Sequence, residues 1–79
     1  MFLVNYTKEK GWQNARVVPY APLAMDPAAC VFHYAQALFE GLKAFRQKNG
    51  DAVIFRPEFN ARRMAFGSER LCMPAVPTD

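Results

Sequence analysis

The feature that most constrains this chain is a charge-free, apolar stretch over residues 27–39. As a helix it is apolar on nearly every side, because only His33 and Gln36 interrupt it. Such a helix needs neighbouring elements around most of its circumference. A chain of 79 residues with 52% hydrophobic residues has little to provide that cover, since small domains bury only about 60–65% of their unfolded surface. We therefore expect a piece of a larger fold, whose apolar surface is covered by further chain or by a partner.

Two strands are predicted in the first quarter of the chain. Residues 2–6 (FLVNY) carry the β-branched and aromatic side chains typical of a strand. Residues 15–20 (ARVVPY) predict a second strand, which Pro19 ends because proline cannot donate to a sheet ladder. The polar residues 7–11 between them predict a turn.

A helix is predicted over residues 28–39. Asp26 is a typical N-cap acceptor, and Pro27 suits the first helical position, where a missing N–H costs nothing. Gly41 is the stop signal after the apolar run.

A hairpin and a second helix complete the predicted fold. Residues 42–47 and 52–56 flank the sequence KNGD, whose Asn-Gly pair is typical of a type I′ turn. Pro57 then opens a helix that runs to about Arg70. The order strand, strand, helix, hairpin, helix predicts an α+β fold of antiparallel strands with flanking helices.

Arg63 is the most informative charged residue of the second helix. The residues expected on a solvated face, with an i,i+4 ion pair between the first two, are Glu58, Arg62 and Glu69. Arg63 instead shares an arc with Phe59 and Phe66, which we expect to be buried. A guanidinium there needs an anionic partner. Either Arg63 reaches solvent or pairs with a nearby carboxylate, or it binds a phosphate or carboxylate ligand.

Aromatic residues also gather at the apolar stretch, where Phe32, Tyr34 and Phe39 lie near His33. Core packing is the simpler interpretation of this composition. The alternative is the wall of an apolar ligand pocket, with the Tyr34 hydroxyl as its polar group.

The residue patterns of an autonomous catalyst are missing. One histidine cannot form a two-histidine metal site, and Cys30 and Cys72 form no CxxC motif. We expect both cysteines to be reduced thiols. Ser68 falls inside the second predicted helix, away from any nucleophile-elbow motif. We therefore expect neither a metal site nor a self-contained catalytic site.

Charge and hydropathy exclude two classes of partner. Ten Lys+Arg against seven Asp+Glu give a net charge of +3, but the basic residues are dispersed rather than clustered as on a nucleic-acid surface. The apolar stretch is shorter than the roughly 20 residues of a membrane-spanning helix, and the first residues lack the basic region of a signal peptide. We expect a cytoplasmic protein with no nucleic-acid or membrane partner.

Specific motifs follow one another in order along the chain: FHYAQALFEGLKAF at 32–45, FRP at 55–57, Asn60, Arg63-Met64 and RLCMP at 70–74. This series closely resembles the branched-chain amino acid aminotransferases, which are pyridoxal-phosphate enzymes of fold type IV. The leading stretch also resembles the family, through GW at 11–12, ARVVPY at 15–20 and Asp26-Pro27.

The resemblance implies that residues 1–79 are part of the small N-terminal domain of such an enzyme. The large domain, which carries the Schiff-base lysine, is then absent from this chain, and the cofactor lies in the cleft between the domains. The implied activity is amino transfer between leucine, isoleucine or valine and 2-oxoglutarate, in branched-chain amino acid biosynthesis. The implied partners are the remainder of the polypeptide and a second subunit in a homodimer.

Three residues match functional positions of the family. Arg63 matches the arginine that binds the cofactor phosphate, Phe39 a residue that contacts the branched substrate side chain, and Tyr34 a pocket tyrosine near the subunit interface. Lys43 lies in the FEGLKAF motif and does not match the Schiff-base lysine. The resemblance thus implies no catalytic residue within this chain, which alone is expected to be inactive.

Two departures and two alternatives accompany this interpretation. Ala35 stands where many family members have glycine, and Gly67 lies inside a predicted helix, where glycine costs about 1 kcal/mol relative to alanine. The alternatives are another fold type IV enzyme (a D-amino-acid aminotransferase or an aminodeoxychorismate lyase) and a small non-catalytic binding module. The lysine-containing motif and RLCMP favour the branched-chain enzyme.

Overall fold

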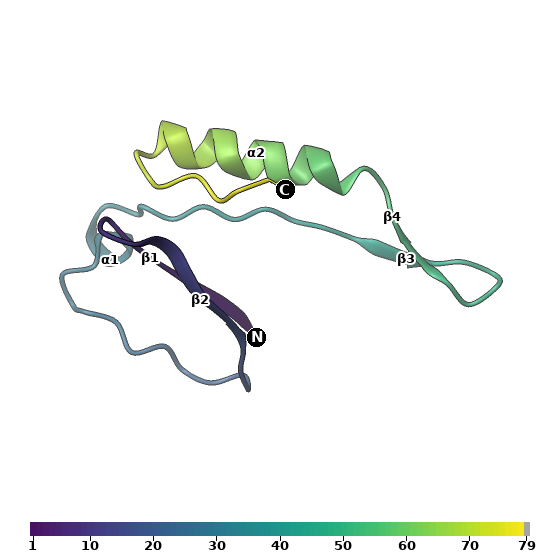
Figure 1. The fold of residues 1–79 in the computed structure, drawn as a ribbon, viewed down its shortest axis with the longest axis horizontal. Helices are drawn as coiled ribbons and strands as arrows, with labels where there is room; N and C mark the ends of the chain where they lie inside the picture. The colour runs from purple at the N-terminus through teal and green to yellow at the C-terminus, as the bar shows by residue number, and fades with distance from the viewer. Residues whose placement is uncertain (79) are drawn as a thin grey trace. The chain divides into compact units, whose positions relative to one another are not determined.

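Antiparallel hairpins and helices alternate along the chain, as a computed structural model shows for residues 1–78 (Figure 1). The described chain divides into one unit over Met1–Ala35 and another that begins at Gln36. Each unit holds one two-stranded antiparallel sheet and one helix. The predicted α+β class is therefore confirmed. No helix within residues 1–78 is both long and apolar enough to cross a membrane.

The first hairpin consists of β1, Phe2–Thr7, and β2, Gly11–Val17. The first strand is confirmed, with one residue added. The second begins four residues earlier than predicted and ends before Pro19. The early start follows from Trp12, which lies opposite Tyr6 with the ring centroids 5.2 Å apart in an edge-to-face arrangement. Such a cross-strand aromatic pair stabilises strand pairing, so the strand extends to residues that precede the predicted range 15–20.

The predicted helix over residues 28–39 is wrong. Only α1, Cys30–His33, is helical. Asp26 does accept a hydrogen bond from the Ala28 amide, at 2.8 Å, but this bond closes a turn before the helix. The chain leaves α1 at Ala35, whose φ of 50° lies in the left-handed region. An apolar helix without cover is unstable, and the residues that follow Ala35 instead lie extended along another helix.

That second helix is α2, Pro57–Arg70, and its predicted bounds are confirmed. Residues 36–41 run along it in the opposite direction. Three contacts mark the register: Gln36 Nε2 donates to the Leu71 carbonyl at 2.8 Å, Leu38 faces Gly67, and Glu40 pairs with Arg63. Two extended residues span about 6.6 Å and four helical residues about 6 Å. Alternate residues of the segment therefore stay in step with successive turns of the helix.

Burial of the 36–41 segment follows this register. Gln36, Leu38 and Glu40 are partly buried, whereas Ala37 and Phe39 are exposed. The alternation is that of an extended chain with one side packed. Phe39, which was predicted to be helical, occupies one of the alternate positions that face away from α2.

Leu38 packs against Gly67, where the absence of a side chain leaves room for it. A Cβ atom at position 67 would lie 2.9 Å from Cδ1 of Leu38, well inside the contact distance of about 3.5–4.0 Å for carbon atoms. The helix-weakening glycine noted in the sequence therefore allows the extended segment to approach the helix backbone closely.

The second hairpin is formed by β3, Ala44–Arg46, and β4, Ala52–Ile54. The predicted hairpin is confirmed, with shorter strands. The predicted type I′ turn is wrong, because of the Asn-Gly pair only Gly50 has a positive φ, 93°. The Gly50 amide donates to the Gln47 carbonyl at 3.0 Å, which describes a type I turn followed by a left-handed glycine.

The buried and partly buried face of α2 consists of small and medium residues: Asn60, Ala61, Met64, Ala65, Gly67 and Ser68. Ser68 is 2% exposed, and its hydroxyl donates to the Met64 carbonyl at 2.9 Å. That bond to the preceding turn satisfies the hydroxyl within the helix.

The predicted buried aromatic arc of α2 is wrong. Phe59 and Phe66 are 44% and 64% exposed, and the Arg63 side chain is exposed as well. Arginines cover the rings instead: the guanidinium of Arg56 lies 3.7 Å from the Phe59 centroid. The predicted i,i+4 pair is also replaced, because the ion pair described for Glu58 is with Arg56, at 3.7 Å.

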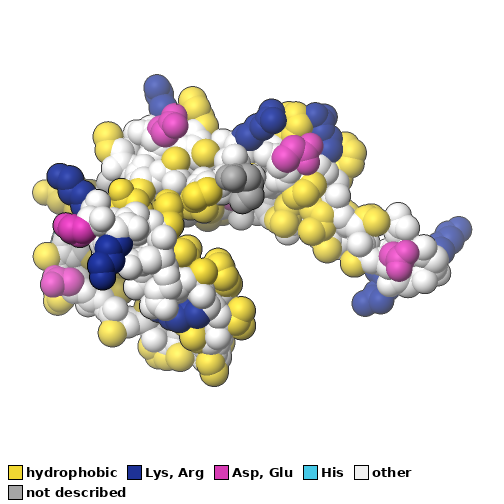
Figure 2. All heavy atoms as spheres, viewed as in Figure 1, with side chains coloured by type: hydrophobic (Ala, Val, Ile, Leu, Met, Phe, Trp, Pro, Cys, Tyr) yellow, Lys and Arg dark blue, Asp and Glu magenta, His cyan; other side chains and the backbone are white. Residues whose placement is uncertain are grey.

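No hydrophobic side chain is buried among residues 1–78. The hydrophobic side chains lie at the surface instead, as the yellow spheres of Figure 2 show. Cys30 and Cys72 are exposed, unpaired thiols. Apolar exposure on this scale is typical of a surface that another part of a protein covers.

Ala35→Gly is expected to stabilise the protein. Ala35 occupies the position after the C-cap of α1 in the left-handed region, which glycine favours and which costs other residues about 1–2 kcal/mol. We expect the free energy of unfolding, measured by urea titration, to rise by about 0.5–1 kcal/mol. Ala37→Gly, in the extended segment, is the matched control and should lower it by a similar amount. A loss of stability in Ala35→Gly would contradict the left-handed conformation.

Candidate functional site

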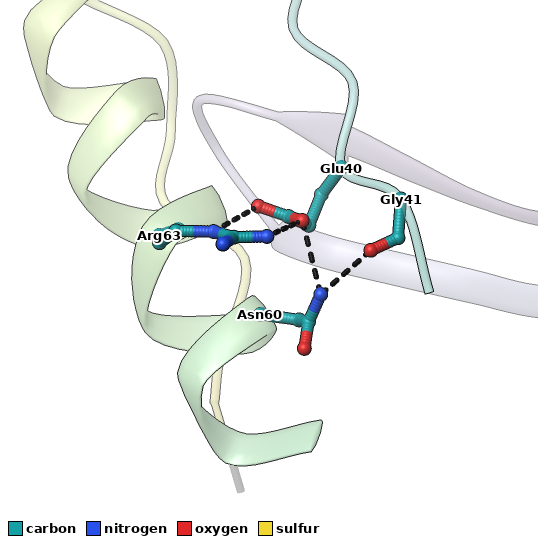
Figure 3. A network of polar contacts seen from close by, with 4 residues as sticks. All are labelled: Glu40, Gly41, Asn60 and Arg63. Carbon is teal, nitrogen blue, oxygen red and sulfur yellow. Dashed lines mark hydrogen bonds and ion pairs between the residues drawn. The ribbon is translucent and has the colours of Figure 1, made fainter. Parts of the chain in front are cut away.

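A polar network joins α2 to the 36–41 segment (Figure 3). Arg63 Nε donates to Oε2 of Glu40 at 2.8 Å, and a terminal nitrogen of the same guanidinium donates to Oε1. The two parallel bonds form the fork geometry that arginine and carboxylate favour. The carboxylate thus holds one edge of the guanidinium.

Asn60 holds the same carboxylate from one turn earlier on α2. Its Nδ2 donates to Glu40 Oε1 at 3.0 Å and to the carbonyl of Gly41 at 2.6 Å (Figure 3). Asn60 and Arg63 are three positions apart, so both side chains lie on the same side of the helix. Together they fix the backbone and the side chain at the end of the extended segment.

The electrostatics of the pair follow from these bonds. The hydrogen bond from Arg63 is the largest cause that lowers the pKa of Glu40, from 4.5 to about 2, with a further contribution from Asn60 and with desolvation acting in the opposite direction. Glu40 in turn raises the pKa of Arg63. Both groups are therefore charged throughout the physiological pH range.

The two members of the pair differ in exposure. The Glu40 side chain is 16% exposed and that of Arg63 is 67% exposed. Within residues 1–78, Glu40 is the acceptor described for Arg63, and it takes two of the five guanidinium N–H groups. The outer edge of the guanidinium is therefore open to a second anion, for which phosphate and carboxylate are the best geometric match.

A shallow depression of about 420 Å³ adjoins this network in the same unit. Its walls share Gly41 and Asn60 with the network. The remaining lining is mainly apolar, with one amine: Leu42, Lys43, Phe45 and Phe55. The volume suits a small molecule.

Comparison with known proteins finds relatives that match nearly the whole chain. No family model matches the chain. Over 76 residues, 96% of this chain, it is 47% identical to branched-chain-amino-acid aminotransferase 2 of Bacillus subtilis, of which it covers 21%. Over its whole length it is 48% identical to the branched-chain-amino-acid aminotransferase of Mycolicibacterium smegmatis, of which it covers 22%. Over nearly its whole length the chain is therefore similar to one part of the branched-chain-amino-acid aminotransferases.

A eukaryotic relative gives the same result. The cytosolic branched-chain-amino-acid aminotransferase of Saccharomyces cerevisiae is 45% identical over 74 residues, which are 94% of this chain and 20% of the relative. The chain thus spans about a fifth of the length of these aminotransferases. The resemblance seen in the motifs is confirmed for the family.

The three residues predicted to match aminotransferase positions lie in two units. Arg63 and Phe39 belong to the second unit, and Phe39 is 90% exposed. Tyr34 is 83% exposed and belongs to the first unit. The carboxylate pairing considered for Arg63 is present at its inner edge, so the phosphate interpretation concerns its outer edge.

Glu40 and Asn60 stand in the motifs of the sequence, but no role was predicted for either residue. The spacing of Asn60 and Arg63 on one helix face was the signal that could have grouped these two residues. Their shared partner is 23 positions before Arg63, so no local pattern relates it to the helix.

Acid is expected to remove the stabilisation that the Glu40–Arg63 pair provides. The folded-state pKa of Glu40, about 2, lies below its ordinary value of 4.5. The contribution is therefore complete above about pH 4.5 and is lost as the pH falls toward 2. We expect the difference in unfolding free energy between the wild type and Glu40→Gln to shrink over this range. Glu58→Gln, which removes an exposed pair, should show at most a small difference. A pH-independent difference for Glu40→Gln would refute the pairing.

Proposed function

We propose that this chain is the N-terminal part of a branched-chain amino acid aminotransferase that uses pyridoxal 5′-phosphate. The enzyme transfers the amino group between leucine, isoleucine or valine and 2-oxoglutarate. The observation that carries the proposal is identity of 45–48% across nearly the whole chain to proteins of that name from bacteria and yeast. We further propose a cytoplasmic enzyme of branched-chain amino acid biosynthesis that binds neither membrane nor nucleic acid.

The proposal includes the remainder of the polypeptide and a second subunit. Residues 1–79 form part of the small domain of fold type IV, and a large domain with the Schiff-base lysine follows. The exposed hydrophobic side chains support this arrangement, because they require cover. The length of the relatives, of which the chain spans about a fifth, supports it as well. By itself the chain is inactive.

The residues present fit the phosphate end of the cofactor. Arg63 offers an exposed, ionised guanidinium edge whose orientation is fixed by Glu40, and such an edge binds phosphate through parallel hydrogen bonds. Pyridoxal phosphate, when bound, supplies the electron sink for the amino-transfer chemistry. Arg63 holds and orients the phosphate, while Phe39 and Tyr34 contact the apolar substrate side chain and exclude water from it.

Two other functions are less well supported. A D-amino-acid aminotransferase or aminodeoxychorismate lyase would share the fold, and a binding module would retain it without activity. The names of the relatives favour the branched-chain enzyme over both.

Arg63→Ala in the full-length enzyme is expected to weaken cofactor retention. Loss of a charge-assisted contact to phosphate costs about 1.5–3 kcal/mol, or roughly 10- to 150-fold in the dissociation constant. The measurement is the pyridoxal-phosphate absorbance that remains with the protein after dialysis. Arg62→Ala is the matched control, because Arg62 is the adjacent arginine and its guanidinium lies 5.8 Å from the Phe59 ring. Equal retention in the two variants would exclude the phosphate role.

Phe39→Ala is expected to impair selection of branched substrates. The full-length enzyme should transfer the amino group of leucine to 2-oxoglutarate, and the loss of an apolar contact of about 1.5–3 kcal/mol should reduce kcat/KM for leucine roughly tenfold or more. The rate with alanine should change less. Phe66→Ala, which removes an exposed ring on α2, is the control. A wild-type enzyme that prefers D-alanine would instead support the alternative aminotransferase.

A further inference from the structure

We propose that Glu40 is a positioning residue that orients the Arg63 guanidinium toward the cofactor phosphate, and that Asn60 holds Glu40 in place. This inference rests on the proposed function, in which Arg63 binds the phosphate. Glu40 does not itself touch the cofactor in this account. It acts through Arg63 alone.

The geometry of the Arg63 guanidinium supports a positioning role for Glu40. An exposed arginine on a helix surface samples many rotamers and loses that freedom when it binds a ligand. Two parallel bonds to Glu40 fix both the plane and the direction of the Arg63 side chain before any ligand arrives. The remaining N–H groups then point away from the carboxylate, as the planar fork of arginine requires.

Glu40 is itself held firmly. Its side chain is largely buried, and its Oε1 accepts a further hydrogen bond from Asn60 at 3.0 Å. Asn60 also binds the next carbonyl, that of Gly41. Two residues earlier, Leu38 lies against Gly67. A carboxylate that is restrained at both its side chain and its backbone can restrict the conformations of the guanidinium that binds it.

The charge of Glu40 opposes its positioning effect, so the direction in which phosphate affinity changes distinguishes the two. A carboxylate beside Arg63 partly cancels the positive charge that attracts a phosphate. If charge were the dominant effect, removal of Glu40 would strengthen phosphate binding. If positioning dominates, removal of Glu40 weakens it. The proposal commits to the second outcome.

The experiment compares two ligands in the cofactor-free, full-length enzyme. Dissociation constants are measured by fluorescence titration for pyridoxal phosphate and for pyridoxal, which lacks the phosphate. The ratio of the two constants isolates the contribution of the phosphate. The variants are Glu40→Gln, Arg63→Ala and their combination, with Asn60→Ala as a weaker perturbation of the same network. Glu58→Gln, in which a glutamate that pairs with another arginine is neutralised, is the matched control.

We expect Glu40→Gln to weaken pyridoxal-phosphate binding by about tenfold, which corresponds to one charge-assisted restraint lost, with little change for pyridoxal. Asn60→Ala should act in the same direction with a smaller effect, and it serves as the test if Glu40→Gln does not fold. Glu58→Gln should leave the ratio unchanged. Because Glu40 acts through Arg63, the double variant should match Arg63→Ala alone.

Several results would overturn the proposal. These are tighter or unchanged phosphate binding in Glu40→Gln, effects that add in the double variant, and an equal loss of affinity for pyridoxal. In each case Arg63→Ala can still weaken the binding of pyridoxal phosphate relative to pyridoxal, so the proposed role of Arg63 survives. An unchanged ratio in Arg63→Ala would refute that role itself, and the inference about Glu40 with it.

Discussion

The packing of the 36–41 segment against α2 is the interaction on which the second unit depends. Three inward residues reach three successive turns of the helix: Gln36 at Leu71, Leu38 at Gly67 and Glu40 at Arg63. The match arises because two extended residues advance nearly as far as four helical ones. The contacts change along the segment from a capping hydrogen bond to an apolar contact and then to an ion pair. The polar end of this series carries the candidate site.

Gly67 illustrates how one position can be unfavourable locally and favourable in the fold. Glycine within a helix costs about 1 kcal/mol relative to alanine. The close approach of Leu38 at this position offsets that cost, since burial of a leucine side chain contributes up to about 1.5–3 kcal/mol. Leu38 is only partly buried, so its gain is smaller than the full value. Further cover over the same residue would increase it.

Local signals predicted the elements that local interactions determine. Pro57 and the Asn-Gly sequence correctly indicated α2 and the second hairpin, because proline geometry and turn preference act over a few residues. The apolar run over residues 28–39 contained no local signal of this kind. Its composition suits a buried helix and an extended buried chain equally well, and only the contacts with α2 select the extended form for residues 36–39. The type of turn at Gly50 was likewise missed, because Asn-Gly permits more than one turn with a left-handed glycine.

The candidate site divides in the same way. The motifs indicated Arg63, Phe39 and Tyr34. The carboxylate partner considered for Arg63 is present, although the buried aromatic arc from which a partner was predicted is not. The identity of that partner depends on the fold, because Glu40 and Arg63 are 23 positions apart. The alternation that turns Glu40 inward also turns Phe39 outward. A residue that holds the guanidinium and a residue proposed to contact the substrate are therefore neighbours in one extended segment. Displacement of that segment from α2 would disturb both, which gives a physical reason for the FEGLKAF motif to act as a unit.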